Sequence, residues 1–538
     1  MFLRYGRLIF ALFCIVLGLA FMLPSLHQSV TTLTSSSDKK VLKLGVVAKE
    51  IVVDPSLAQS RPEKLMASTM YEPLLRYDEI SKSLKPCLAR NWGYSKDGRS
   101  LVIMLANCVY FHNGRQMTAQ DIKNSWERSL RDSKDLELQY LFTTIEGADA
   151  FQQGVADEIK GLKVIDRYTL RIYMNQPDSA LVYKMTNSAF WIVDVTDSVS
   201  TPPGTGPYRL NKLDEKQLVV KSFKNYWGTK PDTGEIYFEA FDDESEALKS
   251  FQNGNLDYLD QVPVKEVAGL AKDSAWKDCL VRVPVLGFYA LGMNVNQYPF
   301  NELQFRQALN YCIDRQHLIN NVMGGVGVAS KGVFPVDLPG YNRALRGYSY
   351  NPELSSELSA ESSYMQESQP PAIKLYFNSD PGQEKLIMAC QAQLENLGLN
   401  IQPMPMNWDD YLGRVTTLQT EFFRFGWDAD YPDPDGFLYP LFHSSQIGIS
   451  NFCAYKNPRL DNILDDARKE TADNQKRIKL LRRAEQIVID DAPMIWLFQK
   501  QSVKMVNPRV KGLQVDGMGL INWKKIELLD GADIKEQS

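Results

Sequence analysis

The pattern of hydrophobic and polar positions predicts strands and helices that alternate along the whole chain. A buried strand is predicted at 41–47, where Val and Leu occupy most positions. A helix is predicted to begin at Thr118, because Asp121 follows in the arrangement of a capping box and Ile122 and Trp126 begin an apolar stripe. This mixture of elements indicates an α/β protein.

The segment around residue 380 has the pattern of a strand, a helix and a second strand. The run IKLYF at 373–377 is strand-like, and an amphipathic helix follows, which Gly398 closes before a second apolar run at 399–403. This order predicts a βαβ unit. Just before it, residues 355–371 are rich in Ser, Glu, Gln and Pro, which predicts an exposed loop.

The N-terminal 40 residues differ from the rest of the chain. Arg4 and Arg7 precede an uncharged run over residues 8–23, and a Ser- and Thr-rich spacer follows at 29–40. This is the layout of an export signal. The run is shorter than the ~17–25 residues that a stable membrane-spanning helix needs, which favours a signal peptide, while an uncleaved tether to the cytoplasmic membrane stays open. We therefore expect a periplasmic or other extracytoplasmic location.

Length and charge narrow the class of protein. At 538 residues the chain is longer than one hydrophobic core usually organises, so two or more lobes are expected. The formal net charge is −5, and the basic residues are interspersed with acidic ones. A nucleic-acid-binding surface needs a coherent excess of Lys and Arg, so nucleic acid is not expected as a partner.

Residues that bind metals or carry out catalysis are sparse. The four histidines lie far apart, and the seven cysteines include no C-x-x-C pair, which argues against a zinc site. The sequence lacks a G-x-S-x-G elbow, an H-E-x-x-H motif, a Walker loop and a Rossmann glycine fingerprint. We therefore predict no cofactor, no metal and no enzymatic activity. Export would permit disulfides, but the sequence does not choose a pairing.

The most unusual segment is FFRFGWDADYPDPDGF at 422–437. It gathers charged and aromatic residues around two prolines, namely Arg424, Trp427, Asp428, Asp430, Tyr431, Asp433 and Asp435. A calcium loop would alternate its acidic ligands and end on Glu at its twelfth position, whereas Pro432 interrupts the alternation and Tyr439 stands twelfth. Paired carboxylates also suit a glycosidase, and a surface turn is the plain alternative, since Asp, Pro and Gly favour turns.

A series of motifs in a fixed order carries a family resemblance. Besides 422–437, the motifs are YEPL at 71–74, VYFHNGRQMTAQDIKNSWERSL at 109–130, GTGPYRL at 204–210, KNYWGTKP at 224–231 and LGMNVNQYPFNELQFRQALNYCIDR at 291–315. Together they resemble extracytoplasmic solute-binding protein family 5, the oligopeptide- and dipeptide-binding proteins of ABC importers. The resemblance covers the chain from Val41 to about Leu528.

The resemblance implies the architecture of the chain. The family fold is an α/β, two-lobed clamp of the periplasmic-binding-protein type (class II), with mixed sheets and two hinge crossings. By this resemblance, residues 1–38 are a signal peptide or anchor with its spacer, and 39–288 form the first lobe with an inserted subdomain. Residues 289–495 then form the second lobe, and 496–538 return to the first.

The resemblance also assigns candidate roles to charged residues. In the peptide-binding members, the aspartate of the G-W-x-A-D motif receives the ligand's α-ammonium group, and here this residue is Asp430. Arg424 is similar to an arginine that holds the ligand's carboxylate, and Arg414 matches another if one gap is allowed. Asp428 departs from the family pattern, which predicts added negative charge and a preference for cationic ligands.

Aromatic and backbone groups complete the predicted ligand-binding set. Trp408 and Trp427 match aromatic positions that line side-chain pockets in the family. Backbone groups near Asp428 are expected to pair with an extended ligand as an added strand. Tyr431, next to Asp430, is included as a ligand-binding residue.

The function implied is capture of short peptides for delivery to the permease subunits of an ABC importer, by a protein expected to be monomeric. Relatives bind other solutes, so glutathione, a murein peptide, haem or a nickel chelate are alternatives. A hydrolase using the carboxylates at 428–435, and an adhesin or chaperone on the same fold, are further alternatives. The sequence does not decide among ligands, the peptide length or the open and closed states.

Overall fold

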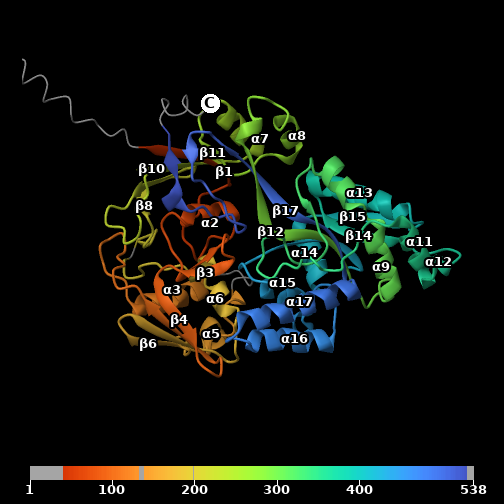
Figure 1. Ribbon diagram of the computed structural model, residues 1–538, viewed down its shortest axis with the longest axis horizontal. Helices are drawn as coiled ribbons and strands as arrows, with labels where there is room; N and C mark the ends of the chain where they lie inside the picture. The colour runs from red at the N-terminus through yellow and green to blue at the C-terminus, as the bar shows by residue number, and fades with distance from the viewer. Residues whose placement is uncertain (1–39, 133–138, 198, 530–538) are drawn as a thin grey trace, which may run out of the picture.

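The computed structural model describes residues 40–529 apart from 133–138 and 198. The predicted export segment and most of the spacer therefore lie outside the described residues. In the part that is described, no helix has the length and apolar character needed to cross a membrane. The chain forms two lobes that lie side by side, with the N-terminal elements in one and most of the later elements in the other (Figure 1).

Two long strands run through the middle of the molecule and contribute to both lobes (Figure 1). They are β12 (Leu280–Met293) and β17 (Met494–Val506), and they pair in antiparallel fashion with a register shift between Pro284 and Phe288. The main sheet has 11 strands in the described residues. Ten of them follow the order β15-β14-β16-β12-β17-β11-β1-β10-β9-β8, and the eleventh, β13 (Val328–Ala329), pairs with β17. The predicted two-lobed clamp with mixed sheets and two crossings is thus confirmed.

The first lobe is built on one end of the main sheet. Its strands are β1 (Val41–Val47), β8 (Tyr208–Leu213), β9 (Gln217–Ser222), β10 (Glu235–Phe241) and β11 (Tyr258–Leu259), with helices α2 (Arg61–Ala67), α7 (Glu244–Gln252) and α8 (Val264–Leu270). The predicted strand at 41–47 is β1, which pairs in parallel with β10. After β17 the chain returns to this lobe through β18 (Val510–Lys511) and β19 (Glu527–Leu528), and Ile526 packs in one core with Leu42.

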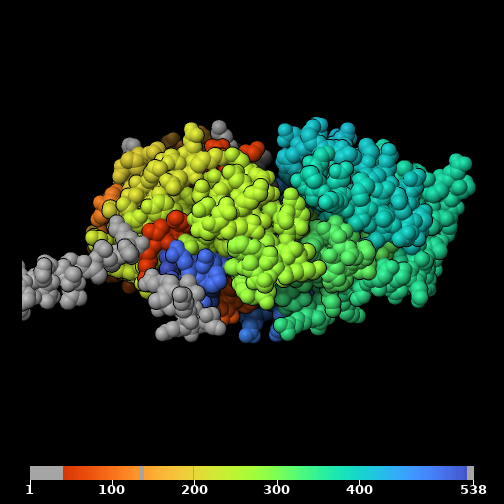
Figure 2. Space-filling model, turned by 90° about the horizontal axis from the view of Figure 1, so that it is seen from above, coloured from red at the N-terminus to blue at the C-terminus, as the bar shows by residue number. Residues whose placement is uncertain are grey.

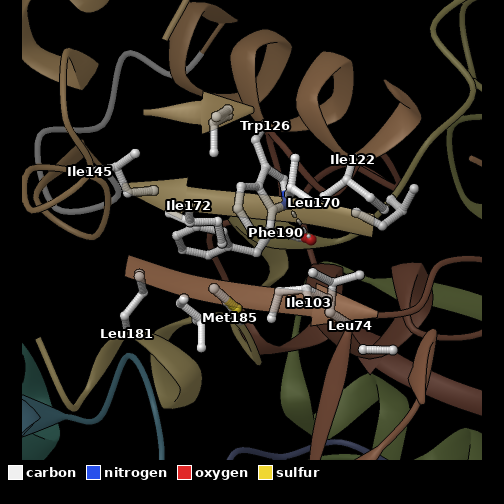
Figure 3. Close-up of a cluster of buried hydrophobic side chains, with 14 of the residues drawn as sticks. Leu74, Ile103, Ile122, Trp126, Ile145, Leu170, Ile172, Leu181, Met185 and Phe190 are labelled. Atoms are coloured by element: carbon white, nitrogen blue, oxygen red, sulfur yellow. Dashed lines mark hydrogen bonds between the residues drawn. The ribbon is translucent and has the colours of Figure 1, made fainter. Parts of the chain in front are cut away.

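A subdomain is inserted into the first lobe. Its sheet has the order β4-β5-β7-β6 and its other elements flank this sheet. The elements are β2 (Leu75–Asp78), β3 (Ser83–Pro86), β4 (Ala89–Tyr94), β5 (Ser100–Leu105), β6 (Leu162–Asp166), β7 (Thr169–Tyr173), α3 (Ala119–Asp132), α5 (Ala148–Gln152) and α6 (Leu181–Lys184). The predicted helix after Thr118 is α3, and its Trp126 lies edge-to-face on Phe190 in the core (Figure 3).

The second lobe contains the predicted βαβ unit. Strands β14 (Ile373–Asn378) and β15 (Ile401–Met406) pair in parallel on either side of α13 (Pro381–Glu395), which confirms the unit. The prediction of a loop at 355–371 was wrong for most of the segment, up to Gln366. Helices α11 (Pro352–Ala360) and α12 (Ser363–Gln366) form there, because Asn351 and Ser362 cap them and Ser355 donates a hydrogen bond to the carbonyl of Ala308.

Helices complete the second lobe and approach the subdomain. They are α9 (Leu303–Cys312), α10 (Arg315–His317), α14 (Trp408–Thr416), α15 (Asp435–Phe442), α16 (Pro458–Lys469) and α17 (Asn474–Asp491). Seen from above, the yellow and lime surface of the first lobe meets the green and teal surface of the second along a seam (Figure 2). The predicted boundaries at 288/289 and 495/496 fall within β12 and β17, and we propose that the hinge lies there.

Candidate ligand-binding cleft

The loop after β16 (Phe422–Asp428) reaches from the second lobe to the first. The carboxylate of Asp430 accepts a hydrogen bond from the Tyr140 hydroxyl at 2.8 Å. Its backbone carbonyl accepts one from the Asn187 side chain, also at 2.8 Å. Because both donors belong to the first-lobe subdomain, Asp430 stands where a ligand between the lobes would touch both.

A cavity of about 540 Å³ opens beside this loop. Its wall combines the first lobe, the crossing strand β12 and the Asp430 loop, represented by Tyr77, Val283 and Asp430. Several aromatic side chains line it, together with charged groups of both signs. A binding site of this kind is large enough for a small solute and is built from groups that fix its orientation.

The segment after Asp430 is fastened by two arginines of the second lobe. Arg477 in α17 makes two hydrogen bonds to the carboxylate of Asp433, at 2.5 and 2.8 Å, and both side chains are at most 1% exposed. Arg468 at the end of α16 holds Asp435 in the same forked manner, at 2.8 and 2.9 Å. The acidic residues of 433–435 are therefore engaged in structure, which leaves them unsuited to the calcium or glycosidase alternatives.

A second polar cluster surrounds Asp428, at the end of β16. Lys500 lies 2.9 Å from one of its oxygens, and Arg61 of α2 lies 3.7 Å from the other. Burial alone would raise the pKa of Asp428, but these two cations outweigh burial and lower it. Because Lys500 and Arg61 already match its charge within the protein, the geometry lends no support to the expectation that Asp428 favours cationic ligands.

Arg424 and Tyr289 extend this cluster along the sheet. The guanidinium of Arg424 lies over the Tyr289 ring at 5.1 Å, and its Nε donates to Gln383 at 3.2 Å. Lys500 lies over the same ring at 4.6 Å. Burial would raise the pKa of the Tyr289 hydroxyl, but Lys500 and Arg424 lower it overall. With Arg61, the cluster holds three cations around one carboxylate, which favours an anionic group nearby.

One edge of β16 is open where the predicted ligand strand would bind. On one side β16 pairs with β12 along its whole length, from Phe422 to Asp428. On the other side β14 pairs only with Phe422 and Phe423. From Arg424 onward, no strand within the described residues covers that edge. Unpaired backbone groups at a sheet edge accept an added strand.

The remaining predicted residues fall into different environments. Trp427 is half-buried, stacks on Phe425 and donates a hydrogen bond to the carbonyl of Gly436. Trp408, 52% exposed at the start of α14, is free to contact a solute, and Arg414 is exposed in the last turn of the same helix. Tyr431 is 0% exposed in the subdomain core and donates to Asp435, so we assign it a packing role instead.

Sequence reasoning missed the first-lobe side of the cleft. Tyr140, Asn187 and the cavity residues on β2 and in the C-terminal segment carry no motif of their own. The C-terminal residues join this wall only because the chain returns to the first lobe after β17, which no local pattern reveals. The sequence feature that came nearest to indicating this side of the cleft was Glu72 within YEPL, since a glutamate in an apolar stretch needs buried hydrogen-bond partners.

Metal-binding clusters and disulfides are not seen in the described residues. No group of three or more His, Cys, Asp or Glu side chains there is arranged to hold a metal ion. The six cysteines of this part are all free, among them Cys87, which is buried, and Cys108, which is exposed. His112 is half-buried against backbone groups of Gly204 and Gly206, and the loss of water around its ring lowers its pKa to about 4.

Comparison with known families decides the class of this protein. A model of the bacterial extracellular solute-binding proteins, family 5 (middle part), matches residues 83–448, well over half the chain. The chain belongs to this family. Members are extracellular solute-binding proteins, in agreement with the clamp and the cleft between its lobes.

Curated relatives within this family bind several solutes. Heme-binding protein A of Haemophilus influenzae is 27% identical over 469 residues, covering 82% of this chain and 84% of the relative. The dipeptide-binding protein of Escherichia coli is 24% identical, with 85% and 89% covered. The oligopeptide-binding protein OppA of Bacillus subtilis is 25% identical, with 91% and 93% covered.

Solved structures share the fold. The periplasmic murein tripeptide-binding protein MppA in its unliganded open form superposes with a TM-score of 0.80 at 23% identity, covering 92% of this chain and 99% of the other. HbpA2 of Haemophilus parasuis gives 0.79 at 20% identity, with 91% and 100% covered. At such identities the likeness establishes the architecture of the two lobes.

Proposed function

We propose that this protein is the substrate-binding component of an ABC peptide importer, which captures short peptides between its lobes and delivers them to the membrane permease. The observation that carries the proposal is the position of Asp430, which bridges the lobes beside the open edge of β16. Relatives that bind dipeptides and oligopeptides support it. The protein acts outside the cytoplasmic membrane, as a monomer and without turnover of its ligand.

In this proposal the peptide's ends and backbone are recognised separately. The α-ammonium group pairs with Asp430, in a charge-assisted hydrogen bond worth about 1.5–3 kcal/mol. The peptide backbone pairs with the edge of β16 from Arg424 to Asp428, which gives affinity that does not depend on side chains. Trp408 and Trp427 offer apolar surface to the side chains. Arg424 and Arg414 provide positive charge for a carboxylate.

The test is a double cycle on the proposed ammonium site. Asp430→Asn keeps the shape of the side chain and removes its charge, so binding of a tripeptide such as Ala-Ala-Ala should weaken by about 2–5 kcal/mol. N-acetyl-Ala-Ala-Ala lacks the ammonium group, so it should bind the native protein weakly and lose little more in the variant. Isothermal titration of both peptides with both proteins gives the coupling free energy.

Two controls make this test specific. Asp409→Asn removes an exposed carboxylate in the first turn of α14 and should leave tripeptide affinity unchanged. Native mass spectrometry of the purified protein identifies any solute that co-purifies, which separates peptides from haem, glutathione and chelates. A coupling free energy near zero in folded Asp430→Asn would remove Asp430 from the ligand site.

A further inference from the structure

The inner wall of the first-lobe cavity carries cations that lack full partners in the protein. Arg76 in β2 lies 3.7 Å from a carboxylate oxygen of Glu72, beyond hydrogen-bond distance. The one hydrogen bond from its guanidinium in the described residues goes to the sulfur of Cys87, at 3.9 Å. Its side chain is nevertheless 37% exposed, and Arg76 lines the cavity. A guanidinium has five N–H donors, so most of them are available to a ligand.

Glu72 does not need Arg76 to satisfy its oxygens. Its buried carboxylate accepts hydrogen bonds from the Tyr226 hydroxyl at 2.6 Å, the Trp227 ring N–H at 3.0 Å and the Thr205 hydroxyl at 3.2 Å. These neutral donors hold the carboxylate in place without a bidentate hydrogen bond from an arginine. Arg76 therefore places a positive charge near Glu72, while most of its N–H groups remain available to a ligand in the cavity.

A second cation lies near Arg76. The ammonium group of Lys524 is 3.5 Å from the Tyr226 hydroxyl, and no carboxylate of the described residues lies within ion-pair distance of it. Burial lowers the pKa of Lys524 and the charge of Arg76 lowers it further, while Glu72 opposes both. Two positive groups thus lie close to the buried carboxylate of Glu72, and Asp516 is a second acidic group near Arg76.

Other cavity groups agree with an anionic occupant. The hydroxyl of Tyr77, a residue only 8% exposed, has no hydrogen-bond partner in the part of the chain that is described. Burial raises the pKa of Asp516 to about 7, so this carboxyl is partly neutral at physiological pH and offsets less of the positive charge. Lys64 and Lys85 also line the cavity, as do the carboxylates of Asp78 and Glu79.

We propose that Arg76 and Lys524 form a carboxylate-binding subsite in the first-lobe cavity. This subsite is separate from the proposed ammonium site at Asp430, a residue that lines the same cavity. The proposal rests on the proposed function and deepens it, because it selects peptides with a carboxylate that reaches the first lobe. That carboxylate is either the side chain of an acidic residue or the peptide's C-terminal group. Arg424, in the second lobe, is a separate candidate for the C-terminal group.

The experiment compares matched tripeptides by isothermal titration. Glu-Ala-Ala, Ala-Glu-Ala and Ala-Ala-Glu are each paired with the Gln twin, and Ala-Ala-Ala is paired with its C-terminal amide. In the native protein we expect at least one carboxylate to improve affinity about tenfold or more, as a charge-assisted hydrogen bond does. Arg76→Gln and Lys524→Gln should each reduce that preference toward onefold.

Control variants locate the effect. Lys511→Gln removes an exposed charge from the same C-terminal segment and should keep the preference. Arg424→Gln should weaken binding of all carboxylate peptides without erasing the difference between the preferred Glu peptide and its Gln twin. Melting curves identify any variant that fails to fold, and Lys524→Gln then stands as the independent test if Arg76→Gln does fail.

The outcomes separate this subsite from the proposed function. Tripeptides that bind the native protein with no carboxylate preference overturn the subsite and leave the peptide-binding function in place. A preference that survives in both folded variants, or that is lost only in Arg424→Gln, also overturns it. If none of the eight peptides binds, the proposed function fails and the subsite fails with it.

Discussion

Glu485 in α17 is a carboxylic acid enclosed in the core of the second lobe. It is 1% exposed, one oxygen accepts the N–H of Phe334 at 3.0 Å, and the other has no hydrogen-bond partner in the described residues. Burial raises its pKa from 4.5 to about 8, and the backbone hydrogen bonds and Arg482 offset this only in part. The folded protein therefore keeps a proton there at neutral pH.

This residue makes stability depend on pH. Between pH 4.5 and 8 the folded state holds a proton that the unfolded state has released, so stability falls as pH rises through this window. Glu485→Gln resembles the neutral acid. We expect the variant to match the native protein at pH 5 and to exceed it by about 2–5 kcal/mol at pH 9, measured by urea unfolding.

An exposed glutamate of the same lobe gives the control for this comparison. Glu357→Gln in α11 should follow the native pH profile, because its side chain is in water in both states. Parallel profiles for the native protein and Glu485→Gln would show that Glu485 titrates in the folded state as an ordinary glutamate does.

At the scale of elements, helices α16 and α17 hold the ligand-facing loop through buried ion pairs. Arg477 also donates to the Ser179 hydroxyl at 2.7 Å, and this hydroxyl donates to the carbonyl of Ala467. The contact joins the first-lobe subdomain to the second lobe away from the crossing strands. The loop that carries Asp430 is thus fixed at its C-terminal side by elements of both lobes.

Removing one member of the Arg477–Asp433 ion pair should destabilise the folded protein far more than removing both. Arg477→Met leaves Asp433 buried without its ionic partner, with the N–H of Asp435 still donating to it, and we expect a loss of about 3–5 kcal/mol in the free energy of unfolding. The double variant Asp433→Leu with Arg477→Met should recover much of the loss, since well-packed apolar residues replace buried pairs at little cost. Denaturant unfolding measures both.

Arg482→Met in the same helix serves as the control, because Arg482 is exposed and its hydrogen bonds to described residues go to the backbone carbonyls of Gly340 and Tyr341. It should change stability by less than about 1 kcal/mol. A single Arg477→Met variant as stable as this control would show that Asp433 finds water or another partner when the arginine is gone.

Local sequence patterns predicted those helices and strands that are determined by residues close together in the chain. The strand β1, the helix α3 and the βαβ unit follow from apolar periodicity and capping residues within a few turns of chain. The helices α11 and α12 were missed because their capping residues, Asn351 and Ser362, stand among other polar residues that are typical of loops. The burial of Tyr431 was not predicted for a different reason, since its packing depends on a core built more than 200 residues earlier in the chain. The same holds for Arg76 and Lys524, which only the complete first lobe brings together.

At the scale of the whole molecule, ligand binding should close the cleft. A peptide that touches Asp430 and the first-lobe cavity makes contacts on both sides, and contacts made only in the closed state shift the population toward it. We expect saturating tripeptide to reduce the radius of gyration measured by small-angle X-ray scattering. The same peptide concentration should change Asp430→Asn less. An unchanged radius with bound peptide would mean that the lobes do not move relative to each other.

The return of the chain to the first lobe also has a consequence for biogenesis. Leu42 and Leu44 near the beginning of the described chain share one core with Ile526 and Leu528 near its end. At synthesis rates of ~5–20 residues per second, the two ends of this core leave the ribosome roughly 25–100 s apart. The lobe that carries half of the binding site therefore stays incomplete until residues 526–528 have been made, so we expect this lobe to fold only after their synthesis.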